Sequence, residues 1–149
     1  MDATEILRIL EEDMGVGIFA TVDAEGKPHA RPIHIGLAND KGIFFMTSPK
    51  TKFYEQLSAN PNLAIAAFQT DDYLVQSIRI EGKAREIGRD KLAEILSNNP
   101  FVDQVYPDQT DRDDIQVFQV YEGQGFYHSL SQGHKYVFEL PGDGPARDL

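Results

Sequence analysis

The sequence predicts one mainly β domain with short helices, folded as an antiparallel barrel. Short apolar runs, many of them alternating or β-branched, recur along the chain between turns rich in glycine, asparagine and proline. Strands do not alternate regularly with long helices, so a parallel doubly wound sheet is disfavoured and a closed antiparallel barrel is favoured. A length of 149 residues, 41% of them hydrophobic, is enough for one core.

The expected elements follow from the spacing of apolar residues. Apolar residues three or four positions apart predict helices, and alternation with polar residues predicts strands, most clearly over residues 78–87. In chain order we expect a helix over 3–14, strands 16–22, 28–37 and 43–47, a two-turn helix from about residue 52, strands 63–68 and 78–87, a helix over 89–97, and strands 115–121, 125–128 and 136–140. The four aspartates of residues 107–114 indicate an acidic loop. Residues 1–140 then form the domain, and the Pro-Gly-rich residues 141–149 form a flexible tail.

Composition excludes several classes of function. The formal net charge is −10 without a dense basic patch, so nucleic acid is not an expected partner, and the absence of cysteine removes disulfides and thiolate chemistry. His29 and His34 lie an odd number of positions apart on one expected strand, which makes them poor joint metal ligands. No apolar run approaches the ~18 residues of a membrane span, and the acidic N-terminus resembles no signal peptide. We therefore expect a cytoplasmic protein that does not enter membranes.

Residues 43–57 are the first candidate for a binding site. An expected strand ends in Thr47 and Ser48, and a helix begins at about Lys52, so hydroxyl groups, unpaired helix amides and an ammonium group converge. Together with Thr51, these groups suit an anion such as phosphate. The alternative is that Ser48 or Thr51 only caps the helix and that the lysines are solvated, since such caps are common.

Arg31 is the second candidate. It lies in the middle of an expected strand among small and apolar residues, where a buried guanidinium without an anionic partner is costly. Pro32 lacks an amide donor, which indicates that the backbone here faces a ligand or a sheet edge. The order of the hairpin is expected to place this strand beside residues 43–47. The alternative is an ordinary surface ion pair between Arg31 and an acidic residue.

Four segments, taken in order, carry a resemblance to a known family. They are residues 21–33, residues 45–48 followed by Thr51 and Lys52, residues 60–64, and residues 81–84. Together they resemble the FMN-binding split-barrel family related to pyridoxine/pyridoxamine phosphate oxidase. The resemblance implies a Greek-key split barrel, a homodimer, and two sites for flavin mononucleotide (FMN) between the subunits.

The resemblance also implies which residues hold FMN, and Ser48 joins them from the anion site described above. Arg31, Pro32 and Ile33 align with the segment that contacts the flavin and its phosphate arm; Met46 and Thr47 align with the strand end beneath the ribityl chain; Thr51 and Lys52 align with the phosphate-binding pair; and Ser77 aligns with a polar position that reaches FMN from the second subunit. Because threonine occupies one of the two basic phosphate positions, Lys50 is expected to supply the second charge.

An FMN-dependent oxidoreductase of unknown substrate is the leading interpretation. True pyridoxine phosphate oxidases end in a segment with a tryptophan and an arginine motif, whereas this chain has no tryptophan and ends in a Pro-Gly-rich tail, so that specific activity is not expected. The alternatives are a non-catalytic flavin-binding or stress-associated module, or a split-barrel relative that uses a deazaflavin or haem. His128 and His134 flank a loop that could approach the flavin, or they are exposed loop histidines.

Overall fold

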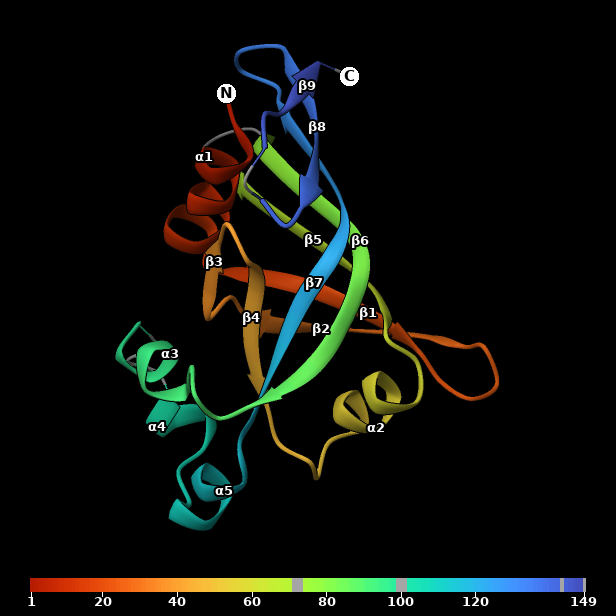
Figure 1. The fold of residues 1–149 in the computed structure, drawn as a ribbon, viewed down its shortest axis with the longest axis vertical. Helices are drawn as coiled ribbons and strands as arrows, with labels where there is room; N and C mark the ends of the chain where they lie inside the picture. Colours follow the sequence, from red (N-terminus) through yellow and green to blue (C-terminus); the bar gives the residue numbers. More distant parts are fainter. Residues whose placement is uncertain (71–73, 99–101, 143, 149) are drawn as a thin grey trace.

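The described residues fold into one antiparallel sheet of nine strands with short helices around it (Figure 1). The computed structural model describes residues 1–70, 74–98, 102–142 and 144–148. The elements in chain order are α1 (Ala3–Arg8), η1 (Ile9–Met14), β1 (Val16–Val22), β2 (Pro28–His34), β3 (Leu37–Asn39), β4 (Gly42–Thr47), α2 (Lys52–Ala59), β5 (Asn62–Thr70), β6 (Leu74–Gly88), α3 (Leu92–Asn98), α4 (Val102–Val105), α5 (Gln109–Asp114), β7 (Gln116–Ser129), β8 (His134–Leu140) and β9 (Arg147–Asp148). The strands pair in the order β2-β1-β5-β6-β7-β4-β3, with β8 beside β7 and β9 beside β8. The prediction of a mainly β, antiparallel domain with short helices is confirmed.

The sheet is curved but not closed. β2 and β3 lie at the two ends of the pairing path, and no pairing joins them within the described residues, although β2 approaches β4. The strand expected over residues 28–37 is divided, because the amide of Gly36 donates to the carbonyl of Phe44 and the chain turns there. β2 then pairs with β1, whereas β3 pairs with β4. The closed barrel is therefore not formed, and the strand that carries Arg31 is not paired with β4.

The N-terminal helix begins and ends where the sequence predicts. The carboxylate of Asp2 accepts a hydrogen bond from the amide of Glu5 at 2.9 Å, which caps α1. The helix continues as the π-helical η1, and Gly15 ends it at a φ of 76°. Leu7 and Leu10 of this helix are fully buried in the main core.

Aromatic rings fill the main core next to the candidate site. The ring of Phe45 on β4 lies 4.9, 5.5 and 5.7 Å, centroid to centroid, from those of Phe19, Phe53 and Phe118. Phe53 belongs to α2, so this packing holds that helix against the sheet. On the opposite face of β4, Phe44 packs with residues of α3 in a second cluster. The loop from β4 to α2 thus starts from a strand that is buried on both faces.

One long strand replaces the two expected over residues 115–128. β7 runs without interruption from Gln116 to Ser129. Its glycines allow other parts of the chain to pack closely against it. A Cβ on Gly123 would lie 2.6 Å from the carbonyl oxygen of Glu81, and one on Gly125 would lie 2.2 Å from the ring of Phe138.

Two C-terminal segments also differ from the expectation. The residues expected as an acidic loop form the short helix α5, because the carboxylate of Asp108 caps it by accepting a hydrogen bond from the amide of Thr110 at 2.8 Å. The described part of the tail pairs with the fold: Arg147 and Asp148 form β9 beside β8, and Pro145 bridges to Asp2. Both chain ends accordingly lie at the same end of the molecule (Figure 1). The flexibility of the tail stays a prediction.

The helices are all short. The longest stretch of α-helix in the described part of the chain, α2, has 8 residues. None of those described is long and apolar enough to cross a membrane.

Candidate functional site

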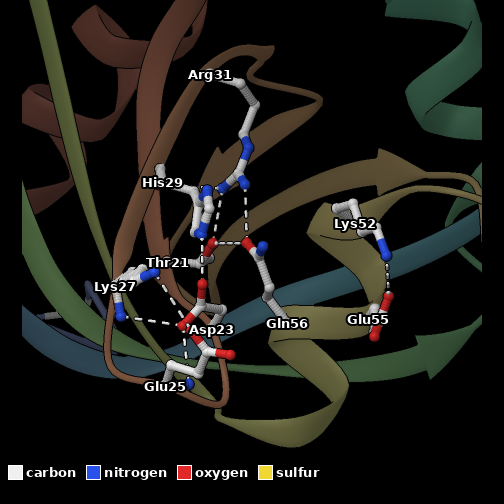
Figure 2. Close-up of polar contacts among 9 residues, drawn as sticks. All are labelled: Thr21, Asp23, Glu25, Lys27, His29, Arg31, Lys52, Glu55 and Gln56. Atoms are coloured by element: carbon white, nitrogen blue, oxygen red, sulfur yellow. Dashed lines mark hydrogen bonds and ion pairs between the residues drawn. The ribbon is translucent and has the colours of Figure 1, made fainter.

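A cavity of about 390 Å³ lies between the β1–β2 hairpin and α2. It is lined by Asp23, Ala24, Glu25, His29, Arg31, Lys52, Glu55, Gln56 and Ala59. The hairpin positions the polar groups on one side, and α2 positions those on the other (Figure 2). Arg31 and Lys52, which the sequence placed in two separate candidate segments, therefore face one space.

Arg31 is held in place by neutral oxygen atoms. It lies opposite Phe19 in the β1–β2 register, so its side chain is on the core-facing side of β2. Its Nη1 donates to the hydroxyl of Thr21 at 2.7 Å, and its Nη2 donates to Oε1 of Gln56 at 2.9 Å. The guanidinium also lies over the ring of Phe53, 4.6 Å from the ring centroid. Figure 2 shows Arg31, Thr21 and Gln56 joined in this network.

Thr21 and Gln56 form a buried polar pair beneath Arg31. Thr21 is 3% exposed and Gln56 is 8% exposed, and the hydroxyl of Thr21 donates to Oε1 of Gln56 at 2.6 Å. Buried polar groups need partners, and here they satisfy each other and the guanidinium. The orientation of the guanidinium is therefore fixed before any ligand arrives.

Arg31 has no acidic partner among the residues that the structure describes. Among the described residues, none of the recorded ion pairs involves Arg31, in a chain with 24 acidic residues. Burial without a compensating anion lowers the pKa of Arg31, because it disfavours the charged form. The described residues therefore do not form the ordinary surface ion pair that was the alternative for Arg31. The half-buried positive charge of Arg31 is left beside the cavity.

The carboxylates of the cavity, in contrast, have partners. Glu25 pairs with Lys27 and Glu55 with Lys52, in both cases with nitrogen and oxygen 3.3 Å apart. Asp23 accepts hydrogen bonds from the amides of residues 25 and 27 through Oδ1, and its Oδ2 lies 2.8 Å from Nε2 of His29. The bond to His29 and those from the amides lower the pKa of Asp23.

The loop between β4 and α2 satisfies most of its own polar groups. Thr51 is the N-cap of α2: its hydroxyl accepts from the amide of Tyr54 at 3.1 Å and donates to the carbonyl of Ser48 at 2.9 Å. Thr47 contacts the same hydroxyl at 3.0 Å. Thr51 therefore caps α2, and its assignment to the phosphate site stays a prediction. Lys50 lies 3.9 Å from Asp114 of α5, and so it turns toward a carboxylate outside the cavity.

Three other predicted residues point elsewhere. Met46 faces the side of β4 opposite to Thr47 and packs on the second cluster, so its side chain does not reach the cavity. Ile33 packs against the main core. Pro32 is exposed on β2, a strand at the end of the pairing path, which agrees with the interpretation that its missing amide marks a sheet edge.

Ser77 lies far from Arg31 within one chain. It is on β6, opposite the exposed Phe68 and therefore on the outer face of the sheet, whereas Arg31 is on the inner face. Three strand spacings separate β2 from β6, on the order of 14 Å. Ser77 lines a separate cavity of about 250 Å³ together with His128, its partner on β7. His134 is exposed at the start of β8, beside the ring of Tyr136.

Four residues of the site were missed from the sequence: Thr21, Asp23, His29 and Gln56. Asp23 and His29 flank a turn and look like ordinary hairpin residues. A weak signal was present for Gln56, since a glutamine among the apolar positions of a short helix needs a buried partner. Its partner Arg31 lies 25 positions away, and only the packing of α2 on the hairpin brings them together.

Comparison with known proteins shows the family. Residues 4–125 match the family model described as pyridoxamine 5'-phosphate oxidase, and the chain belongs to this family. A curated relative, the pyridoxine/pyridoxamine 5'-phosphate oxidase of Burkholderia vietnamiensis, is 30% identical over 81 residues, which are 54% of this chain and 37% of that protein. The match thus spans less than half the length of that relative. The resemblance predicted from the sequence is confirmed at the level of the family.

Solved structures share the fold. A NimC/NimA family protein from Clostridium acetobutylicum has a TM-score of 0.72 and 23% identity, with 91% of each chain covered. A haem-binding protein from Mycobacterium smegmatis has a TM-score of 0.67 and 21% identity over 85% of this chain and 54% of that one. An FAD-binding protein from Mesorhizobium loti has a TM-score of 0.68 and 16% identity over 83% and 91%. At these identities the likeness concerns the fold alone.

Proposed function

We propose that this protein is an FMN-binding flavoprotein that acts as an oxidoreductase. The observation that carries the proposal is Arg31, a pre-oriented and half-buried guanidinium that has no anionic partner in the described part of the chain and faces a cavity shared with Lys52. An arginine so placed suits the oxygens of a phosphate, which it binds through two parallel hydrogen bonds. Membership of the pyridoxamine 5'-phosphate oxidase family and the fold of a neighbour described as FAD-binding support a flavin as the carrier of that phosphate.

The residues present fit the phosphate end of FMN. Arg31 and Lys52 would supply two charges, and the first amides of α2 would add donors at the positive end of the helix. The hydroxyl of Thr51 is already used in capping, so its contribution is to hold the helix start in place. When bound, the flavin supplies electron or hydride transfer, and the protein orients it and excludes water.

The ring of the flavin requires a second subunit in this proposal. Within one chain Ser77 lies on the outer face of the sheet, whereas Arg31 lies on the inner face, so the sheet separates the two side chains. The outer face exposes Val16, Ile18 and Phe68, which are 38%, 41% and 60% exposed. A homodimer that covers this face would bring Ser77 of one chain toward the phosphate site of the other, as in the split-barrel arrangement.

Two measurements test the proposal directly. The visible spectrum of the purified protein, before and after addition of FMN, distinguishes a flavin from a deazaflavin or a haem. Light scattering with and without FMN gives the oligomeric state. We expect a dimer with two flavins, and a monomer that holds FMN at full occupancy would refute the shared site.

Turnover separates an oxidoreductase from a storage or sensing module. If the protein is an enzyme, a nicotinamide cofactor or another donor should reduce the bound flavin and an acceptor should reoxidise it. Flavin that binds tightly but is not reduced by any donor would favour the non-catalytic module. The likeness to a haem-binding protein makes haem the second candidate cofactor, and a haem spectrum would replace the proposal.

A further inference from the structure

His29 is a titratable group in the cavity to which the proposed function gives no role. It lies two positions from Arg31 on β2, so both side chains are on the same face of the strand, and both line the cavity. The side chain of His29 is 43% exposed, and its Nε2 lies 2.8 Å from Oδ2 of Asp23 (Figure 2). Within the described part of the chain, no hydrogen bond to the other ring nitrogen, Nδ1, is recorded. That nitrogen is available to a ligand.

We propose that His29, oriented by Asp23, is a third cationic ligand for a phosphate monoester in this cavity and takes up a proton when the ester binds. This inference rests on the proposed function, since FMN is the phosphate monoester considered. It adds a residue that sets specificity for the phosphate and makes the affinity depend on pH.

The balance of charge around His29 explains why one proton matters. The charged groups that face it from the hairpin and from α2 are Asp23, Glu25, Glu55, Lys27, Arg31 and Lys52. The carboxylates equal the permanent cations in number, so the cavity is close to neutral while His29 is neutral. A proton on His29 makes the cavity positive. In the free protein the positive charge of Arg31 disfavours a proton on His29. A bound phosphate with two negative charges offsets the charge of Arg31 and favours that proton.

Asp23 is built to hold His29 and to stay ionised. Its Oδ1 accepts hydrogen bonds from the amides of Glu25 and Lys27 at 2.8 and 3.0 Å, which fixes the carboxylate in the turn. Its Oδ2 is then directed to the ring of His29. An ionised carboxylate in this position orients the imidazole, because the hydrogen bond to Nε2 fixes the ring and leaves Nδ1 directed away from Asp23. Asp23 is thus a positioning residue, and His29 is the group that contacts the ligand.

Proton uptake determines the direction of the pH dependence. If binding takes up a proton, the affinity rises as the pH falls, by reciprocal linkage. Histidine ordinarily titrates near pH 6.5, and a phosphate monoester keeps its second charge above about pH 6, so the effect falls between about pH 8.5 and 6.5. We expect FMN to bind roughly tenfold more tightly at the lower pH, as one charge-assisted contact predicts. Riboflavin, which lacks the phosphate, should show no such change.

Calorimetry in buffers of different ionisation enthalpy measures the proton uptake directly. FMN and riboflavin are titrated into wild type, His29→Gln and Asp23→Asn at both pH values. Asparagine can still accept the two amide bonds of the turn, so Asp23→Asn removes the charge and preserves the hairpin. His134→Gln is the matched control, because His134 is an exposed histidine on β8 outside this cavity.

The expected results are specific. Wild type and His134→Gln should take up a fraction of a proton with FMN, His29→Gln should take up none, and Asp23→Asn should take up less than wild type. At pH 6.5 the wild-type protein should bind FMN roughly tenfold more tightly than His29→Gln does, and at pH 8.5 the two affinities for FMN should converge. FMN that binds His29→Gln as tightly as wild type at pH 6.5, with unchanged proton uptake, overturns the inference but leaves the proposed function intact. FMN that binds no better than riboflavin to the wild-type protein overturns both.

Discussion

Replacing Arg31 with methionine tests whether Arg31 serves to bind FMN or to stabilise the fold. In the free protein the guanidinium donates two short hydrogen bonds to neutral acceptors, Thr21 and Gln56, each worth about 1.5 kcal/mol because the donor is charged. Its position over Phe53 adds about 0.5–1 kcal/mol. The burial that lowers the pKa of Arg31 opposes these gains. Methionine keeps an unbranched apolar chain against the ring, so we expect the free energy of unfolding to change by less than about 1.5 kcal/mol.

The affinity for FMN should change much more. A charge-assisted contact to a phosphate is worth about 1.5–3 kcal/mol. Arg31→Met should therefore lower the affinity for FMN by roughly tenfold to a hundredfold and leave the affinity for riboflavin almost unchanged. Calorimetric titration with both flavins and urea unfolding measure the two effects. Arg85→Met is a matched control: Arg85 lies 4.6 Å from the ring centroid of Tyr121 and donates to Gln119 at 3.2 Å, but it is exposed outside the cavity. Equal losses for FMN and riboflavin, or a loss of stability above about 3 kcal/mol, would show that Arg31 acts through folding.

The hydrogen bond from Tyr54 to Glu86, at 2.7 Å, raises the pKa of Tyr54. The contribution of this hydrogen bond to stability is therefore present below about pH 10 and is lost as the pH rises through the raised pKa. Ultraviolet titration should therefore show that Tyr54→Phe removes an ionisation above the usual range and that Glu86→Gln returns it to that range; an unchanged titration curve for Glu86→Gln would contradict this. Gly125→Ala places a Cβ 2.2 Å from the ring of Phe138, and we expect a loss of about 1–3 kcal/mol in urea unfolding, whereas Gly144→Ala, with nothing within 4 Å, should be close to neutral. Finally, pyridoxine phosphate should not reduce FMN bound to this protein under anaerobic conditions, and rapid bleaching of the flavin would show a substrate clamp that has not been identified.

The sequence alone determined the class of fold and most of its elements. Alternation of apolar and polar residues places the strands, because one face of each strand must be buried, and capping residues such as Asp2 and Gly15 place the helix ends. Local patterns failed where a residue serves a distant neighbour. Gly123 fell between two expected strands, yet it lies within β7, where the backbone of Glu81 on the neighbouring strand approaches it closely.

The candidate site was predicted only in part, for the same physical reason. Arg31 and Lys52 were identifiable because a lone arginine among small residues and a cation at a helix start are local signals. The absence of an acidic partner for Arg31, its support by Gln56 and the placement of His29 beside it are not local. They depend on how α2 packs against the hairpin, which Phe53 decides through its contacts with Phe19 and Phe45. The sequence therefore determined which charges are available, whereas the tertiary structure decided which of them are neutralised, because the energy of a charge depends on its distance to every other group and on its access to water.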